Sequence, residues 1–378
     1  MCALPAGSAM GDTITFGIVG GYGATGRAVV AELWKSGRGE IQIGGRDLAK
    51  GSALAAEFDG RVSAMHLDVL DSRSLEEFCS RSSIIVNCGG PLKVSEDRVA
   101  QVALRRRCHY IDPGGYSFIK QRLLPHSREI ADLKLSYVLS AGWIPGISEV
   151  LPVYADARAR AEMDTVESVS AYFGDGSEWS TTALRDGVWY IRHGLRGPGH
   201  FHKGEWVRAN PFRAYPRANL GGRLGSRRFC VYSGPELAEV GRRLNHCDFF
   251  AHSYLAGSQV VIAGVLVAFF PLPEQWGVRL VRRVFRSARL PVGGFVAARA
   301  VGRSQERRLA LSVQTYYEER CQYWANGLVP ATLARMVSES KSVTAGLHFL
   351  ADAVDPIAFM TELRKSGLEL AENVETCE

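Results

Sequence analysis

The stretch TITFGIVGGYGATGRAVVAELWKSG, residues 13–37, decides the fold of the first part of the chain. Its β-branched, apolar start predicts a strand over 13–19, and the pattern after the glycine-rich loop is typical of a helix that ends at Gly37. Within the loop, Gly21, Gly23 and Gly26 have the spacing G-x-G-x-x-G. In the dinucleotide fold the first glycine makes the tight turn, the second admits the pyrophosphate, and the third lets helix and strand pack closely. The loop therefore predicts a dinucleotide site, with free amides at the helix start facing the phosphates.

A second predicted strand covers residues 40–44 (EIQIG) and leads into Gly45, Arg46 and Asp47. An NAD-specific site presents an acid to the ribose hydroxyls near this position. Arg46 instead can stack on adenine and pair with a 2′-phosphate, with Lys50 a turn into the next helix, so the sequence favours NADP(H). The alternative, in which Arg46 is merely exposed and Asp47 binds the ribose, stays open because the acid is adjacent.

Strands and helices continue to alternate up to about residue 150. The sequence predicts further strands over 62–67, 83–87, 108–111 and 136–140, and helices over 72–81 and 97–107. This alternation is typical of an α/β fold with a parallel sheet. Because ligands of open α/β sheets lie at the carboxyl ends of the strands, we expect Asp68 near the adenine and residues 88–91 near the nicotinamide.

Six motifs occur in an order and spacing similar to those of the saccharopine dehydrogenase-like (saccharopine reductase) family: GGYGATG, GGRD, LDVLD, VNCGGPL, CHYIDPGG and AGWIPGISEV. The resemblance covers residues 13–155 well and the end of the chain loosely. It implies a Rossmann dinucleotide-binding domain with an inserted α+β substrate domain on a mixed or antiparallel sheet, a C-terminus that returns to the first lobe, and a site between the lobes.

The resemblance also implies roles for individual residues. The pyrophosphate would be held by Gly21, Tyr22, Gly23, Ala24, Thr25 and Gly26, the 2′-phosphate by Arg46, the adenine by Asp68 and Val69, and the nicotinamide bordered by Cys88, Gly89, Gly90 and Pro91. Asp112 and Tyr116 would lie on the substrate side. Residues 111–115 lack the glutamate that many relatives carry after this glycine, so the identity of the substrate does not transfer from that position.

The predicted organisation has four parts. Residues 1–12 are expected to be disordered, 13–150 to form the Rossmann NADP-binding domain, 151–330 a substrate and dimerisation domain, and 331–378 a C-terminal helical segment that returns to the first lobe. Short β-like runs broken by glycine- and arginine-rich loops (VSAYF, RRFCVY, RLALSVQTYY) predict a sheet in the second part. A homodimer is one option that this organisation leaves open.

Composition narrows the class of protein. With 378 residues, 46% hydrophobic and 22% charged, the chain has an ordinary globular composition that excludes a wholly disordered or collagen-like chain. Eight scattered cysteines without a C-x-x-C pair predict free thiols, and the start lacks the features of a signal peptide, so we expect a cytoplasmic protein. The net charge of +6 comes without a nucleic-acid recognition motif, and His193, His200 and His202 lack zinc-like spacing. We therefore expect neither nucleic-acid binding nor a metal.

Two further stretches leave alternatives open. Residues 260–273 (VVIAGVLVAFFPLP) are too short to span a membrane and predict a buried strand or helix. They precede Arg279, Arg282, Arg283, Arg286 and Arg289, a spacing that predicts a basic helix face. Residues 260–290 would then contact anionic lipid or an acidic carrier protein, or form a solvated face over the core. Residues 178–182 with Arg185 would line a pocket or begin a helix capped by Ser180.

Together these features predict an NADPH-dependent reductase of a C=N (imine) or polarised C=C bond in a small or carrier-bound metabolite. Asp112 and Tyr116 are the candidates for proton delivery or substrate orientation. Packing beside a loop is the alternative for Tyr116. The alternative functions are a trans-acting enoyl reductase that docks on a carrier protein, and a sensor or scaffold that binds NADP without chemistry.

Overall fold

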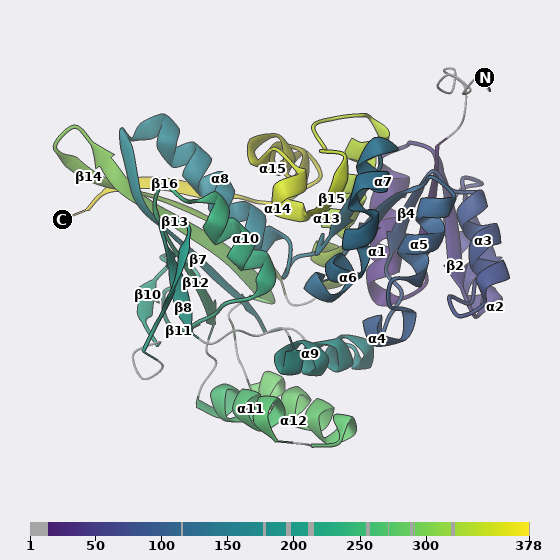
Figure 1. Ribbon diagram of the computed structural model, residues 1–378, viewed down its shortest axis with the longest axis horizontal. Coiled ribbons are helices and arrows are strands. Elements are labelled where there is room, and N and C mark those ends of the chain that lie inside the picture. The colour runs from purple at the N-terminus through teal and green to yellow at the C-terminus, as the bar shows by residue number, and fades with distance from the viewer. Residues whose placement is uncertain are drawn as a thin grey trace.

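A computed structural model describes residues 14–114, 116–176, 179–193, 198–210, 215–254, 258–270, 272–287, 290, 292–318 and 322–377. The segment predicted to be disordered, 1–12, lies outside these residues, as do Gly115, Glu178 and Arg289. Two lobes lie side by side, each built on one sheet, with the C-terminal helices between them (Figure 1).

The first lobe is a doubly wound parallel sheet. Its strand order is β15-β6-β5-β4-β1-β2-β3, and every neighbouring pair is parallel. The strands are β1 (Thr15–Val19), β2 (Glu40–Gly45), β3 (Val62–His66), β4 (Ile84–Asn87), β5 (His109–Asp112), β6 (Ser136–Leu139) and β15 (Gly346–Phe349). The order reverses between β1 and β4, so the crevice in which such sheets bind ligands lies beyond the carboxyl ends of these two strands. This confirms the Rossmann fold predicted from the sequence.

Helices cover both faces of this sheet. They are α1 (Ala24–Lys35), α2 (Leu48–Ala55), α3 (Ser72–Ser80), α4 (Leu92–Ser95), α5 (Arg98–Arg105), α6 (Tyr116–Leu123), η1 (Leu124–His126) and α7 (Ser127–Asp132). The apolar stripe of α1 (Val29, Val30 and Leu33) is fully buried against one face, while α3 and α5 bury their stripes against the other. Burial of strand side chains on both faces explains the continuous apolar runs of the sequence.

The second lobe carries the predicted mixed sheet. Its order is β10-β11-β12-β7-β13-β14-β16, in which β12 and β7 are parallel and the other neighbours antiparallel. The strands are β7 (Thr165–Asp175), β8 (Gly199–His202), β9 (Glu205–Arg208), β10 (Arg217–Asn219), β11 (Ser226–Val231), β12 (Asp248–Tyr254), β13 (Gly294–Ser304), β14 (Arg307–Tyr317) and β16 (Ala371–Thr376). Helix α8 (Ile147–Glu162) packs across one face, and α10 (Pro235–Arg243) packs against α8 and β12.

Three helices form a separate layer: α9 (Thr181–His193), α11 (Ser258–Phe269) and α12 (Glu274–Ser287). Figure 1 shows α11 and α12 at the outer edge of the molecule, with α9 between them and the first lobe. The prediction of a buried segment at 260–273 is partly wrong, because α11 buries Ala263 and Val267 but exposes the opposite side of the helix. Ser180 caps α9, since its Oγ accepts a hydrogen bond from the Ala183 N–H at 3.2 Å.

The C-terminal part returns to the first lobe and then to the second. It comprises α13 (Gln322–Ser338), β15, α14 (Leu350–Ala353), α15 (Pro356–Lys365) and β16, so it is not the purely helical segment that the sequence predicts. The signal for β16 is missing because AENVET is polar and exposed along its whole length. A Cβ on Gly327 would lie 2.5 Å from the Cβ of Ala28, so glycine is what lets α13 cross α1 at close range.

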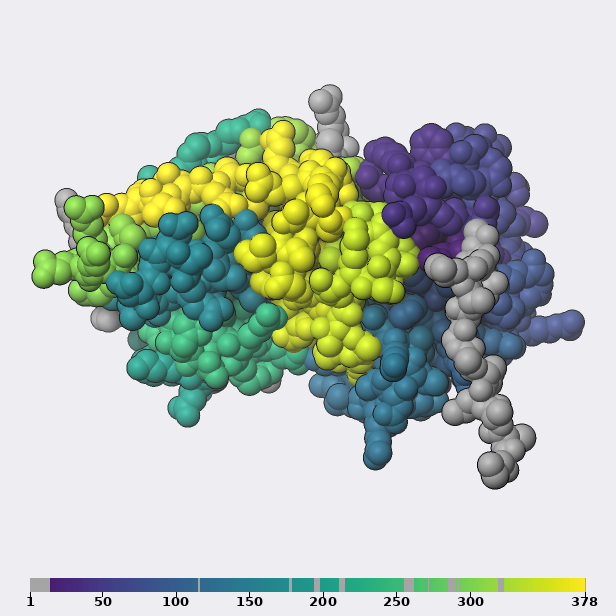
Figure 2. Space-filling view, turned by 90° about the horizontal axis from the view of Figure 1, so that it is seen from above, coloured from purple at the N-terminus to yellow at the C-terminus, as the bar shows by residue number. Residues whose placement is uncertain are grey.

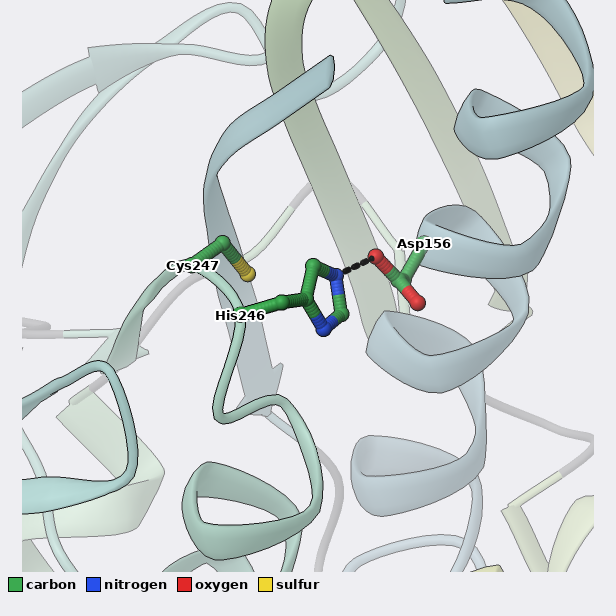
Figure 3. Close-up of side chains that lie close together, drawn as sticks. All are labelled: Asp156, His246 and Cys247. Carbon is green, nitrogen blue, oxygen red and sulfur yellow. Dashed lines mark hydrogen bonds and ion pairs between the residues drawn. The ribbon is translucent and has the colours of Figure 1, made fainter. Parts of the chain in front are cut away.

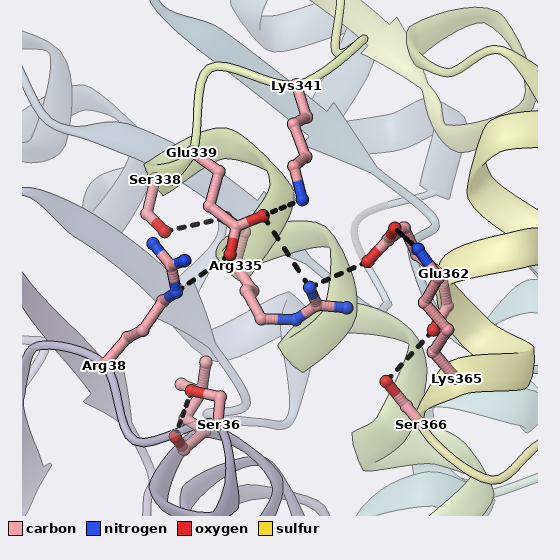
Figure 4. A network of polar contacts seen from close by, with 10 residues as sticks. Ser36, Arg38, Arg335, Ser338, Glu339, Lys341, Glu362, Lys365 and Ser366 are labelled. Atoms are coloured by element: carbon pink, nitrogen blue, oxygen red, sulfur yellow. Dashed lines mark hydrogen bonds and ion pairs between the residues drawn. The ribbon is translucent and has the colours of Figure 1, made fainter.

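An ion-pair network fixes this segment to the first lobe (Figure 4). Arg38, in the loop after α1, contacts Glu339 at 2.9 Å, and Arg335 of α13 contacts Glu362 of α15 at 2.8 Å. The side chains of both glutamates in these pairs are largely shielded from water. Figure 2 shows the C-terminal segment, in yellow, lying across the junction of the lobes.

Candidate active site between the lobes

The glycine loop after β1 makes its tight turn one residue earlier than predicted. Gly20 has φ +70, a left-handed conformation that suits glycine, whereas Gly21 is not in that region. Gly21 is needed for another reason, since a Cβ there would lie 2.9 Å from Ile43 Cγ2. At Gly26 a Cβ would lie 2.3 Å from the Gly20 carbonyl oxygen, so this glycine permits the close packing of helix and loop that the motif predicts.

The amino-terminal end of α1 is open to an anion. Its N-cap is Gly23, which has no capping side chain, and the first turn contains no acid. A Cβ at Gly23 would meet only the Gly20 oxygen, at 3.1 Å, so the space on that side of Gly23 is otherwise free of protein atoms. Unpaired amides and the positive end of the helix dipole stabilise phosphate at such a terminus. These residues fit a pyrophosphate.

The end of β2 presents a cation rather than an acid. Arg46 is exposed and has no ion-pair partner among the residues that the structure describes. The Asp47 carboxylate instead accepts a hydrogen bond from the Lys50 N–H at 3.1 Å and contacts Lys50 Nζ at 3.0 Å. These contacts lower the pKa of Asp47. The Tyr22 hydroxyl accepts a hydrogen bond from the Asp47 N–H at 3.0 Å, so Tyr22 supports the end of β2 and not only the phosphate loop.

Asp68 and Val69 follow β3 at the same edge of the sheet, and both are half-buried. Asp68 Oδ1 accepts a hydrogen bond from the Leu70 N–H at 2.9 Å, which fixes this turn. The structure thus brings these two residues to the same edge as Arg46, as the predicted adenine site requires.

Residues 88–91 follow β4 and contact the second lobe. A Cβ on Gly90 would lie 2.7 Å from Thr182 Cγ2 of α9, and the Leu92 N–H donates a hydrogen bond to Asp186 Oδ1 at 3.0 Å. Burial raises the pKa of the Cys88 thiol, so this cysteine is uncharged at neutral pH. The loop predicted to border the nicotinamide therefore lies directly beneath α9.

Asp112, at the end of β5, is held in a buried network. Its Oδ2 accepts hydrogen bonds from Tyr110 Oη at 2.7 Å and Asn87 Nδ2 at 3.1 Å, and its Oδ1 accepts one from the Gly114 N–H at 2.8 Å. Asp112 is only 3% exposed. Both carboxylate oxygens are engaged, an arrangement that suits fixing the ends of β4 and β5 better than delivering a proton.

Tyr116 begins α6 and faces the second lobe. Its ring lies 5.1 Å from the ring of Tyr190 on α9, measured between centroids. Burial raises the pKa of Tyr116, and the nearby Asp186, Glu236 and Asp112 add to this effect. The structure therefore places Tyr116 in contact with a second-lobe aromatic at the junction of the lobes.

The second lobe brings further polar groups to this junction, which were not predicted from the sequence. Tyr190 Oη lies 3.3 Å from Glu236 Oε2, and Ser140 Oγ, after β6, lies 3.2 Å from Glu236 Oε1. Glu236 is 3% exposed, and burial raises its pKa. Burial raises the pKa of Tyr232, which follows β11, and the nearby Glu236 adds to this effect. No motif marks Tyr190, Tyr232 and Glu236, because they lie 74 to 120 positions after Tyr116 and have no recognisable spacing relative to it.

Two more carboxyl groups of raised pKa lie at the same junction. Burial raises the pKa of Glu149, on the first turn of α8, to about 7, and the Ser148 hydroxyl donates to it at 2.7 Å. Burial raises the pKa of Asp186 to about 6. Asp186 and Tyr190 are four residues apart on α9, so they share one face of the helix, a signal that could have found them. We call Tyr116, Asp186, Tyr190, Tyr232, Glu149 and Glu236 the interlobe cluster.

Each of the three histidines considered as metal ligands contacts a different partner. His193 Nδ1 contacts the Trp189 oxygen, His200 stacks on Phe250, and His202 pairs with Asp248. A different group, Asp156, His246 and Cys247, brings three potential ligand atoms within 4.8 Å of one another (Figure 3).

The contacts of Asp156 identify this group as an ion-pair cluster. Its carboxylate, 1% exposed, contacts His246 Nε2 at 2.8 Å and Arg160 Nε at 3.0 Å. The Arg160 guanidinium already supplies the positive charge that a metal would bring. Burial raises the pKa of the Cys247 thiol to about 12. The cluster joins α8 to the turn before β12.

A separate hollow of about 380 Å³ lies on the side of the second sheet away from α8. Residues of β13, β14 and β16 and of the 219–222 turn line it, and it includes none of the predicted site residues. No helix in the described part of the chain is long and apolar enough to cross a membrane.

Comparisons with known proteins agree with this geometry. Residues 16–136 match the family described as the saccharopine dehydrogenase NADP binding domain. A protein of Arabidopsis thaliana named as a probable mitochondrial saccharopine dehydrogenase-like oxidoreductase is 25% identical over 168 residues, which cover 41% of this chain. The match spans 37% of that protein's own length.

Solved structures show the same overall fold. Saccharopine dehydrogenase (L-Glu forming) from Saccharomyces cerevisiae has a TM-score of 0.64 at 14% identity, covering 96% of this chain and all of the other. A probable dehydrogenase from Thermotoga maritima has a TM-score of 0.50 at 7% identity, covering 95% and 98%. Residues 16–136 therefore match a saccharopine dehydrogenase NADP binding domain, which supports a nicotinamide cofactor, and the whole chain has a fold similar to that of the Saccharomyces cerevisiae saccharopine dehydrogenase.

Proposed function

We propose that the protein is an NADPH-dependent reductase of a C=N or polarised C=C bond. The observation that carries the proposal is the interlobe cluster, which gathers tyrosines and carboxyl groups of raised pKa from both lobes beside the loop after β4. Reduction of such a bond needs a hydride on one atom and a proton on the other. When bound, the nicotinamide cofactor supplies the hydride. The protein must supply the proton.

The proposed preference for NADP(H) rests on the end of β2. Arg46 is exposed and unpaired among the described residues, so it is available to a 2′-phosphate. The Asp47 carboxylate, which would bind ribose hydroxyls in an NAD site, is occupied by the Lys50 N–H and ammonium. Both observations support the phosphate-bearing cofactor over NAD(H).

Tyr190 is our candidate for the proton donor, with Glu236 behind it. Their oxygens are 3.3 Å apart, and burial keeps Glu236 protonated to a higher pH than a surface glutamate. Tyr116 lies against the Tyr190 ring and would orient the substrate. This assignment gives Asp112, which the sequence suggested for proton delivery, a positioning role through Tyr110 and Asn87, because hydrogen bonds engage both of its carboxylate oxygens.

The test separates binding from turnover. NADPH oxidation is followed with a panel of cyclic imines, keto acids with amines, and enoyl thioesters, using the whole chain and its Tyr190→Phe and Glu236→Gln variants. We expect NADPH binding, measured by the change in cofactor fluorescence, to be unchanged while turnover falls about 100-fold, the usual contribution of a general acid. Tyr154→Phe is the matched control, since Tyr154 donates to Glu372 away from the cluster.

Turnover that survives in both cluster variants would refute the assigned donor. Tight NADPH binding without oxidation across the whole panel would instead favour a sensor or scaffold.

A further inference from the structure

The helix pair α11–α12 carries an apolar surface that the described part of the chain leaves uncovered. Phe269 is 80% exposed, and four other large apolar side chains on the same pair are 46–57% exposed: Ile262, Val265, Phe270 and Trp276. We call these five residues the α11–α12 face. Their concentration on two neighbouring helices marks an interaction surface, because single exposed apolar residues are normally scattered.

The pattern of α11 is that of a helix with two apolar sides. Ala263 and Val267 face the core shared with Leu184 and Val188 of α9. Ile262, Val265 and Phe269 are spaced by three and four residues, so they form a stripe on another side. The first side holds the helix in the layer. The second has no structural role inside the described chain.

Charge on α12 identifies the partner. The helix sequence EQWGVRLVRRVFRS contains four arginines and one acid, Glu274. Glu274 is already paired with Lys93 and with Arg185, whose Nε lies 2.6 Å from it. Arg279 is exposed with its guanidinium 5.9 Å from the Trp276 ring, and Arg283 is also exposed. Exposed arginines therefore lie on the same helix pair as the apolar α11–α12 face, one of them beside Trp276.

We propose that the α11–α12 face docks on a membrane surface rich in anionic lipids. Phenylalanine and tryptophan inserted at the headgroup boundary, with arginines beside them, are the side chains of helices that lie in that interface. Basic residues near such a surface add electrostatic attraction to the anionic headgroups. The pair also lies at the outer edge of the molecule, so it can reach a flat surface without a clash from either sheet (Figure 1).

The position of α9 connects this face to the candidate active site. Leu184 and Val188 pack against Val267 of α11 and Val278 of α12, while Asp186 and Tyr190 of the same helix belong to the interlobe cluster. A docked protein would therefore hold its cluster one helix away from the lipid. Docking itself is independent of the proposed reductase activity, and its test needs no substrate.

The experiment is co-sedimentation of the whole chain with vesicles of phosphatidylglycerol and phosphatidylcholine, compared with phosphatidylcholine alone. We expect binding to the anionic vesicles that weakens with salt, and a loss of at least about tenfold in the double variant Phe269→Ser/Phe270→Ser. The matched control is Leu70→Ser/Leu124→Ser, which removes from the first lobe two apolar residues that are more than half exposed. Arg279→Glu/Arg283→Glu tests the charge separately, with circular dichroism confirming that each variant is folded.

Absence of binding to anionic vesicles, or equal loss in the Phe and Leu double variants, would overturn the proposal. Sedimentation velocity supplies the other decisive outcome. A dimer that dissociates in Phe269→Ser/Phe270→Ser would assign the face to a second copy of the chain, and capture of an acyl carrier protein without vesicle binding would assign it to that protein. Either result would also overturn lipid docking.

Discussion

Replacing Glu362 by glutamine should weaken the attachment of the C-terminal segment in a pH-dependent manner. Glu362 contacts Arg335 Nη1 and Lys365 Nζ, each at 2.8 Å, and its side chain is only 10% exposed. These cations lower its pKa from 4.5 to about 2. Because the pKa is lowered on folding, the ionised carboxylate stabilises the folded state above the unfolded pKa, and this contribution is lost as pH falls from 4.5 towards 2.

The size of the effect follows from the two pKa values. Their difference corresponds to at most about 3 kcal/mol in the free energy of unfolding at neutral pH. The free energies of unfolding of the wild type and of Glu362→Gln are measured by urea unfolding at several pH values from about 7 down to about 3. Their difference gives the contribution of the carboxylate directly. We expect the gap between the two proteins to be widest near neutrality and to narrow in acid. A gap that is constant over this range would refute the electrostatic account, since loss of shape alone does not depend on pH.

Three other substitutions test the two lobes. Gly26→Ala places a Cβ 2.3 Å from the Gly20 oxygen, so we expect the free energy of unfolding to fall by about 1–3 kcal/mol. We also expect NADPH binding, measured by calorimetry, to be lost, and an unchanged affinity would refute the assigned loop. Arg46→Asp should weaken NADPH about tenfold or more while sparing NADH, and equal loss with both cofactors would count against its role. The pKa of Glu149 is raised to about 7, so the free energy of unfolding of the wild type should fall by up to about 3 kcal/mol as pH rises from 4.5 to 7. Urea unfolding of Glu149→Gln should show no such fall, and a fall of the same size in this variant would refute the assignment.

The first lobe is predictable from sequence because its signals are local. Strand, glycine loop and helix occupy consecutive residues, and each glycine meets a steric demand within that unit. The error in the loop is a shift of the tight turn from Gly21 to Gly20, and it arises because two adjacent glycines give no signal for which one is left-handed. The cation at Arg46 is likewise readable, since it follows directly from the end of β2.

The second-lobe part of the candidate site is not predictable in the same way. Tyr190 and Glu236 meet only when α9 and α10 fold against the first lobe, and neither belongs to a motif. Their pKa values depend on burial that residue type alone does not encode. The exposure of Phe269 could not be predicted either, because an apolar run normally indicates burial inside the fold. Such a run stays exposed in the isolated chain when its role is to contact a partner.

We propose that residues 20–26 and Arg46 hold the diphosphate and 2′-phosphate of NADP(H). The decisive measurement is titration calorimetry of the whole chain with NADPH, NADP⁺, NADH and NAD⁺. We expect one site per chain and tighter binding of the two cofactors that carry the 2′-phosphate. Absence of heat with all four nucleotides, at concentrations that saturate a micromolar site, would contradict it.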